Sequence, residues 1–363
     1  MRRPIFLLFL SLLLAVPLAA CQPAAPATPT AAPTPSTKTL TDMAGQTVTI
    51  PLPILRFASP SPADITYFSV LGVADKLVAT DARIPTPDFA ITFKKIAPST
   101  LSIAYPFSGS DVNMEELLKA KPQFTFMPMG DKRIATIQAA GIPVIQTAPN
   151  LTVDQISHLV TFYGDVFGGD AVQNAKNVTD YYAAQKSLIT SKIGAMPAGQ
   201  KSKIILMQYH GGGVFIVFGR NTWQDDAITL VGGINEAASE IDGKKSDVTM
   251  EQLLKWDPDV IILSDVNQTT AKPVFAMAGW DQLTAVKNQR MYINPTGIYG
   301  FTSQVVEAFL EVQWLAKTFY PNQFPDLDLN KETKHVLVDF YHYNVSDAEV
   351  EDILKATGVF HGA

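Results

Sequence analysis

A thirteen-residue segment that occurs twice constrains the fold of this chain more than any other feature of its sequence. SDVNMEELLKAKP begins at Ser110 and SDVTMEQLLKWDP begins at Ser246, an offset of 136 residues. Nine of the thirteen aligned positions are identical. A segment repeated at this distance predicts one structural unit used twice, so we expect two similar halves.

Each copy of the repeat predicts a short helix followed by a buried strand. Asn113 followed by Glu116 fits an N-capping pattern, and Thr249 followed by Gln252 fits a capping box. The paired leucines that come next would face the core, and a proline would end each helix. The runs FTFMP and DVIIL then supply the strands.

Elsewhere, short apolar runs alternate with helical patterns. Short runs rich in Val, Ile and Phe, separated by helices, predict an α/β fold. We therefore expect two lobes, each with a mostly parallel sheet. The strand candidates are residues 54–59, 76–80, 124–129, 143–147, 203–209, 214–219, 259–264 and 290–294.

Between the two halves, residues 152–193 show no strand pattern. Gly168 and Gly169 divide this stretch into two helices. The second helix would span about 24 residues and roughly 36 Å, enough to join two lobes with a ligand cleft between them. An ordinary surface helix within one domain is the alternative. Its expected buried face consists of Val172, Ala175, Val178, Tyr182, Ile189 and Ile193.

The N-terminus has the pattern of a bacterial lipoprotein. Arg2 and Arg3 precede an apolar run, which ends in small residues before Cys21. Cys21 is the only cysteine, so an intramolecular disulfide and a cysteine-based metal site are excluded. We expect a lipid on Cys21; an ordinary secretory signal with a chance cysteine is the alternative. The Pro-, Ala- and Thr-rich residues after it predict an extended tether.

These patterns predict a division of the chain into five parts. They are a signal peptide (1–20), a lipidated cysteine with its linker (21–38), an N-terminal lobe (39–168), an interlobe helix (169–196) and a C-terminal lobe (197–363). Removal of Arg2 and Arg3 takes the formal net charge from −6 to −8. An acidic surface argues against nucleic acid as a partner.

Glu115 and Glu251 occupy the second helical position of the two repeat copies. A carboxylate there gains about 0.3–1 kcal/mol from the helix dipole, which is sufficient reason for its presence. A second interpretation is that two equivalent, exposed carboxylates dock onto a partner that is itself two-fold.

The chain resembles the substrate-binding proteins of ABC importers, in the class whose two lobes are joined by one long helix. The resemblance covers residues 39–354. It rests on the two glutamate segments, TDMAGQTVTIP (41–51), YFSVLGVADKLVAT (67–80), GRNTWQDDAITLVGGINEA (219–237) and the tail from Trp314 to Leu354. Members of this class bind ferric siderophores, haem, cobalamin and, in some cases, oxyanions.

The resemblance implies a role without catalysis and without a cofactor. The lipid on Cys21 would hold the protein at the extracytoplasmic face of the cell membrane. Glu115 and Glu251 would form salt bridges to arginines of a permease dimer, whose ATPase subunits drive transport. The first expected cargo is an iron–siderophore-type chelate; cobalamin, haem, molybdate and tungstate are alternatives.

Ligands of open α/β sheets bind beyond the carboxyl ends of the strands, so we expect the ligand residues in the predicted loops there. Aromatic rings and an arginine suit a bulky, partly apolar chelate. Each of these residues could instead be a core aromatic or a solvated arginine. The candidate ligand residues are Trp223, Arg220, Tyr299, Tyr105, Tyr209 and Phe301.

Three other classes are less consistent with the sequence. His210 and the three glycines after it resemble a lipase oxyanion-hole motif, but the chain contains no G-x-S-x-G nucleophile elbow, so an exported hydrolase is disfavoured. Its five histidines are scattered, which disfavours a metal held by protein ligands. A purely structural surface lipoprotein would not need the repeated unit.

Overall fold

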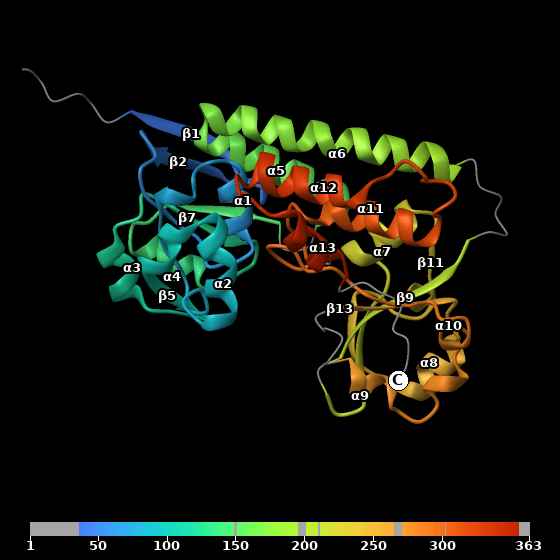
Figure 1. Cartoon of the computed structure of the whole chain (residues 1–363). Helices are drawn as coiled ribbons and strands as arrows, with labels where there is room; N and C mark the ends of the chain where they lie inside the picture. Colours follow the sequence, from blue (N-terminus) through green and yellow to red (C-terminus); the bar gives the residue numbers. More distant parts are fainter. Residues whose placement is uncertain are drawn as a thin grey trace, which may run out of the picture. The chain divides into compact units, whose positions relative to one another are not determined.

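The computed structural model describes residues 36–148, 151–194, 201–209, 211–264, 271–301 and 303–355. The chain from Ser36 onward forms one compact unit. Two sheets divide this unit into two lobes, and the long helix α6 (Asp170–Gly194) runs between them (Figure 1). The expected signal peptide, Cys21 and His210 lie outside the described residues.

The first lobe contains a hairpin and a six-stranded sheet. The hairpin pairs β1 (Thr37–Thr41) with β2 (Thr47–Pro51), as expected from the opening motif. In the sheet only the pairing of β6 with β5 is antiparallel. Its strands, in spatial order, are β6 (Asp111–Val112), β5 (Ala104–Ser108), β4 (Leu77–Asp81), β3 (Phe57–Ala58), β7 (Thr125–Pro128) and β8 (Val144–Thr147). Its helices are α1 (Asp64–Val70), α2 (Pro87–Ile96), α3 (Met114–Ala120) and α4 (Ile134–Ala139).

The second lobe is built on another six-stranded sheet. Strands β9, β11, β13 and β14 are parallel, whereas β10 and β12 run antiparallel to their neighbours. The spatial order is β12 (Lys244–Val248), β10 (Phe215–Phe218), β9 (Lys203–Tyr209), β13 (Val260–Ser264) and β14 (Met291–Ile293), with β11 (Ile234–Asn235) beside β9. Its helices are α7 (Trp223–Leu230), α8 (Met250–Trp256), α9 (Lys272–Phe275) and α10 (Thr284–Lys287). The predicted two-lobed α/β class is confirmed.

The repeated segment forms the same three elements in both lobes. An edge strand leads into a helix and then into an inner parallel strand: β6, α3 and β7 in the first lobe, β12, α8 and β13 in the second. Both helices end at a residue in the left-handed region, Lys121 (φ 49°) and Asp257 (φ 41°). Leu117 and Leu253 are fully buried as predicted, but Leu118 is 47 % exposed.

The two repeat helices differ at their N-termini. The Asn113 side chain accepts a hydrogen bond from the Glu116 backbone N–H at 3.1 Å, which confirms the predicted cap. The predicted capping box at Thr249 is wrong, because this side chain makes no cap hydrogen bond. The Gln252 side chain donates from its amide nitrogen to Glu240 Oε2 at 3.3 Å.

The two helices predicted between the lobes are confirmed as α5 (Val153–Phe167) and α6. The 25 residues of α6 extend over roughly 37 Å. Its buried face includes Ala171, which is 3 % exposed, whereas the predicted Val172 is 44 % exposed. The face is shifted at this end because α6 begins against Gly164 of α5, where only a small residue fits.

Replacing Gly164 with alanine should therefore destabilise the protein. A Cβ there would lie 2.7 Å from Ala175 Cβ and 2.9 Å from the Ala171 oxygen, so α5 and α6 must move apart. We expect Gly164→Ala to lower the free energy of unfolding by about 1–2 kcal/mol in urea titrations. Gly194→Ala is the matched control, since no atom of the described residues lies within 4 Å of a Cβ there. Equal effects of the two substitutions would contradict the close-packing explanation.

The chain after β14 does not stay within the second lobe. It forms α11 (Ala308–Phe319), α12 (Leu329–His335) and α13 (Asp347–Lys355), of which α11 and α12 lie beside α6 (Figure 1). Lys95 of α2 lies 3.6 Å from the Glu349 carboxylate and 5.1 Å from the ring centroid of Tyr343. The tail therefore returns to the first lobe, and the predicted range 197–363 joins residues that contact both lobes.

Candidate ligand site

Two of the predicted ligand residues lie at the carboxyl edge of the second sheet, where ligands of α/β folds bind. Tyr209 is the last residue of β9, and its ring packs 5.5 Å from that of Phe215. Tyr299 lies in the loop that follows β14 and is partly exposed. Phe301 belongs to the same loop but is only 1 % exposed, so it supports the loop from within the core.

Arg220 and Trp223 lie at the opposite edge of that sheet. They follow β10, which runs antiparallel to β9, so the end of β10 lies beside the beginning of β9. The side chain of Asn235, which pairs with Ile204 near the start of β9, donates to the Phe218 carbonyl at 2.9 Å. Trp223 is in addition only 2 % exposed. Neither residue shares an edge with Tyr299.

Tyr105 also points away from the carboxyl edge of its sheet. It is the second residue of β5, and its hydroxyl donates to the Thr100 carbonyl, ahead of the strand, at 3.0 Å. Its backbone N–H donates to the Glu116 carboxylate of α3 at 2.9 Å. Burial raises the pKa of the Tyr105 hydroxyl. These contacts assign Tyr105 a structural role beside α3.

The carboxyl end of β4 presents an arginine that the sequence analysis did not select. Arg83 Nε lies 2.8 Å from Oδ1 of Asp81, the last residue of β4, and Nη2 lies 3.3 Å from Oδ2. The hydrogen bond to Asp81 raises the pKa of Arg83. The Asp81 side chain is 6 % exposed, but that of Arg83 is 60 % exposed. Arg83 Nη1 donates to no group among the described residues.

A second Asp-x-Arg turn in the same lobe shows what is unusual about Arg83. Arg133 also forms two hydrogen bonds with the aspartate two residues earlier, and its hydrogen bond lowers the pKa of Asp131. Its Nη1 donates in addition to the carbonyls of Gly109 and Asp111 at 3.1 and 3.3 Å. Only 10 % of the Arg133 side chain is exposed. The guanidinium of Arg133 is bound to other groups of the first lobe, whereas much of the Arg83 side chain is exposed to solvent.

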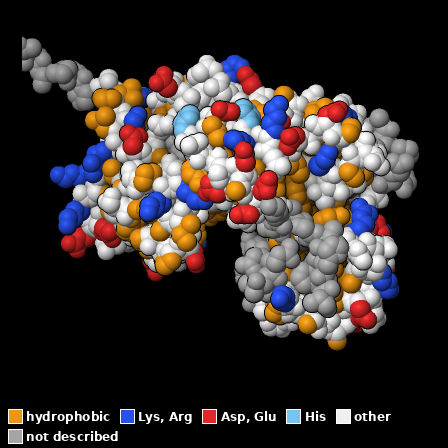
Figure 2. All heavy atoms as spheres, viewed as in Figure 1, with side chains coloured by type: hydrophobic (Ala, Val, Ile, Leu, Met, Phe, Trp, Pro, Cys, Tyr) orange, Lys and Arg blue, Asp and Glu red, His pale blue; other side chains and the backbone are white. Residues whose placement is uncertain are grey.

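Arg83 is joined by two aromatic side chains, one from each lobe. The ring centroid of Phe89 in α2 lies 5.5 Å from the Arg83 guanidinium carbon. The Tyr299 ring lies 6.4 Å from that of Phe89, and its charge interaction contributes to the raised pKa of Arg83. We call these three residues the Arg83 site. Figure 2 shows the surface indented between the two lobes, with hydrophobic side chains beside the indentation.

The composition of the Arg83 site suits an anionic ligand. A guanidinium offers paired donors to carboxylate, phosphate-like or hydroxamate oxygens. The rings of Phe89 and Tyr299 can pack on an apolar part of the same ligand. A sequence signal for Arg83 existed: DAR follows the strand run KLVAT directly, at the edge where ligands bind.

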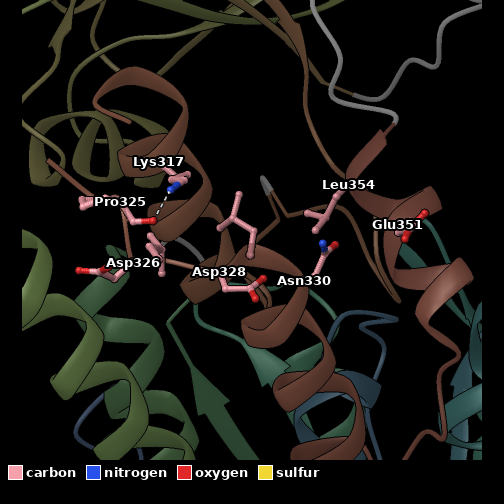
Figure 3. A pocket seen from close by; sticks show the side chains of 9 residues that line it. Lys317, Pro325, Asp326, Asp328, Asn330, Glu351 and Leu354 are labelled. Carbon is pink, nitrogen blue, oxygen red and sulfur yellow. Dashed lines mark hydrogen bonds between the residues drawn. The ribbon is translucent and has the colours of Figure 1, made fainter. Parts of the chain in front are cut away.

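Several hollows in the described residues lie away from Arg83 and Tyr299. One of about 680 Å³ lies beside α11, α12 and α13 (Figure 3). Lys317 in its wall donates to the carbonyls of Phe324 and Pro325, so its ammonium is already bound. Within the described residues, no three His, Asp, Glu or Cys side chains are placed to hold a metal ion. No helix in this part of the chain is long and apolar enough to span a membrane.

The two repeat carboxylates are solvent-accessible. Glu115 is the second residue of α3, and Glu251 is the second residue of α8; both are exposed. The helices belong to different lobes, and neither lies beside α6 (Figure 1). This placement leaves both carboxylates accessible to a partner protein.

Known proteins resemble this chain in sequence and in structure. The chain is 24 % identical over 332 residues to the molybdate-binding protein MolA of Haemophilus influenzae, covering 84 % of this chain and 91 % of that protein. It is 23 % identical over 296 residues to YvrC of Bacillus subtilis, an uncharacterized ABC transporter substrate-binding lipoprotein, covering 79 % and 87 %. A periplasmic solute-binding protein from Veillonella parvula superimposes with a TM-score of 0.75 at 26 % identity, covering 88 % and 97 %.

The Veillonella parvula protein shares the fold of this chain over 97 % of its own length. The family described as periplasmic binding protein matches residues 58–296, which include nearly all of the two six-stranded sheets, α6 and Arg83 but end before Tyr299. The chain therefore belongs to the periplasmic binding protein family of ABC importers.

Proposed function

We propose that this protein captures an anionic small molecule at the Arg83 site and delivers it to the permease of an ABC importer. The observation that carries the proposal is the exposed guanidinium of Arg83, held at the end of β4 by Asp81 and facing Tyr299 from the other lobe. A ligand that bridges these residues would favour closure of the lobes by its contacts with both.

Molybdate and tungstate are the first candidates for the cargo. MolA, which is related over 84 % of this chain, is named as a molybdate-binding protein. A tetrahedral oxyanion accepts hydrogen bonds from the guanidinium of Arg83 and from a phenol such as that of Tyr299. An iron–siderophore-type chelate is the second candidate, because Phe89 and Tyr299 offer ring surfaces that a bare oxyanion would not need.

The proposed role also includes a lipid anchor on Cys21 and a permease partner. A lipid on Cys21 would hold the protein at the extracytoplasmic face of the cell membrane, and YvrC is likewise named as a lipoprotein. Glu115 and Glu251 would dock on arginines of the two permease subunits. Transport would then be driven by the ATPase subunits of the importer.

A thermal-shift screen of residues 22–363 tests the proposal. The panel contains molybdate and tungstate, sulfate and phosphate as anion controls, ferric siderophores, cobalamin and haem. A ligand at about 100 times its dissociation constant should stabilise the protein by about 2.7 kcal/mol. Stabilisation by molybdate and tungstate alone supports an oxyanion cargo, and stabilisation by one chelate class supports the second candidate. A cooperative unfolding transition that no member shifts would count against both.

A further inference from the structure

The loop that carries Tyr299 is held by one buried carboxylate. Glu307 is fully buried, and its Oε1 accepts a hydrogen bond from the Tyr299 backbone N–H at 2.9 Å. Gly297, at the start of this turn, donates from its backbone N–H to the Tyr299 carbonyl at 2.9 Å. A Cβ on Gly297 would lie 3.1 Å from the Phe301 ring and 3.6 Å from Glu307 Oε1, so the turn is closely packed on this carboxylate.

The same carboxylate is bound from the C-terminal tail. The hydroxyl of Tyr341, which follows the π-helical turn Val336–Phe340, donates to Glu307 Oε2. Tyr341 is only 3 % exposed. Burial raises the pKa of Glu307, while the hydrogen bonds from Tyr341 and Tyr299 oppose that rise. Each carboxylate oxygen thus has a different partner, one in the tail and one in the ligand loop.

The loop is also tied to the first lobe. The Tyr67 hydroxyl of α1 donates to the Gln304 carbonyl at 2.7 Å, and the Leu151 backbone N–H donates to Gln304 Oε1 at 3.1 Å. These contacts position the end of the loop but do not reach Tyr299. Glu307 therefore connects the Tyr299 backbone N–H to the Tyr341 hydroxyl of the tail, and it does so in addition to the Thr296–Gly300 bridge within the loop.

We propose that Glu307 and Tyr341 are positioning residues that hold Tyr299 in place for ligand, so that the C-terminal tail sets the affinity of the Arg83 site. This inference rests on the proposed ligand function of that site. A purely structural role would also give Tyr341 a hydrogen bond in the core. The two roles predict different results. If Tyr341 acts by positioning Tyr299, then substituting Tyr341 weakens ligand binding only when the Tyr299 side chain is present.

The first test needs no ligand. Hydrogen exchange of the peptide covering residues 297–301 is compared between the wild-type protein and Tyr341→Phe. Loss of the hydroxyl should free Glu307 to move and speed exchange at the Tyr299 amide by about tenfold. Tyr343→Phe is the matched control, because its hydroxyl donates to Glu349 Oε1 at 2.6 Å in the same tail, away from Glu307. The control should leave this exchange unchanged.

The second test is a double-mutant cycle with molybdate as the probe, read by isothermal titration calorimetry. We expect Tyr341→Phe to weaken binding by about tenfold in the wild-type background and by less than about twofold in the Tyr299→Ala background. Tyr343→Phe should leave affinity within about twofold in both. If molybdate does not bind, the ferric siderophore that shifts the melting transition replaces it.

The outcomes separate the inference from the proposed function. Unchanged exchange in Tyr341→Phe, or faster exchange with unchanged affinity, overturns the positioning role. Equal losses of affinity with and without Tyr299 also overturn it and leave a structural role. If no probe binds the wild-type protein, the proposed function fails, and the exchange result alone then decides whether Tyr341 holds the loop.

Discussion

Arg83→Ala should weaken ligand binding by about a hundredfold, which corresponds to about 2.7 kcal/mol. Arg83 would supply charge-assisted hydrogen bonds to an anion at a site where the two lobes meet, and such contacts contribute most to binding. Titration calorimetry with the ligand identified by the thermal-shift screen measures the effect. Because Asp81 is buried and would lose its partner, the measurement is made well below the melting temperature of the variant.

The second Asp-x-Arg turn, which contains Asp131 and Arg133, provides the control for this prediction. Arg83→Lys keeps a positive charge beside Asp81 but loses the planar fork, so we expect a smaller loss of affinity, about tenfold. Arg133→Lys makes the same change at a side chain that is 10 % exposed and bound to two backbone carbonyls. It should lower the free energy of unfolding by about 1–2 kcal/mol and leave affinity within about twofold. If both lysine variants affected affinity equally, Arg83 would not be the ligand contact.

Reversing the charge of both repeat carboxylates should reduce ligand uptake by at least about tenfold in cells that carry the importer. Glu115→Arg and Glu251→Arg would place arginine opposite arginine at both docking points, and like charges at an interface cost several kcal/mol. Both side chains are exposed, so ligand affinity should stay unchanged. The melting temperature should fall only slightly, because each helix loses about 0.3–1 kcal/mol of dipole stabilisation at its N-terminus. Uptake of labelled ligand and calorimetry on the purified variant measure the two expectations separately.

A carboxylate on the linker helix controls for the reversal of a surface charge outside the repeat helices. Asp180 of α6 is exposed and pairs with Lys176 one turn away, remote from the repeat helices in the sequence. Asp180→Arg should leave uptake unchanged. Normal uptake by the double glutamate variant would reject the docking role, and an equal loss in Asp180→Arg would indicate a general effect of surface charge.

The fold could be predicted in outline because its inner strands and repeat helices have strong local signals. The run VIILS is recognisable as a buried strand from its short length and β-branched residues, and the helix from Met250 from its capping residue, paired leucines and final proline. The edge strand KKSDV is not, since it is polar and takes its conformation from pairing with β10. The same holds for the two-residue strand β6, which is defined by its partner β5.

The ligand residues were harder to predict because strand direction is not encoded locally. Arg220 follows an apolar strand, as a ligand residue should, but β10 runs antiparallel and carries it to the other edge. Arg83 follows β4, whose parallel pairing with β3 places it at the ligand-binding edge. Their immediate sequences do not distinguish these two arginines. Only the pairing of strands far apart in the chain does.

The return of the tail to the first lobe limits how the two lobes can move. Bodies connected at one point keep three rotational degrees of freedom, whereas bodies connected at two separated points keep rotation about the line between them. Here the lobes are linked through α6, through the contacts of Lys95 with Tyr343 and Glu349, and through those of Gln304 with Tyr67 and Leu151. Any wider opening must loosen one of these links, so a ligand at the Arg83 site would act on lobes that are already held together.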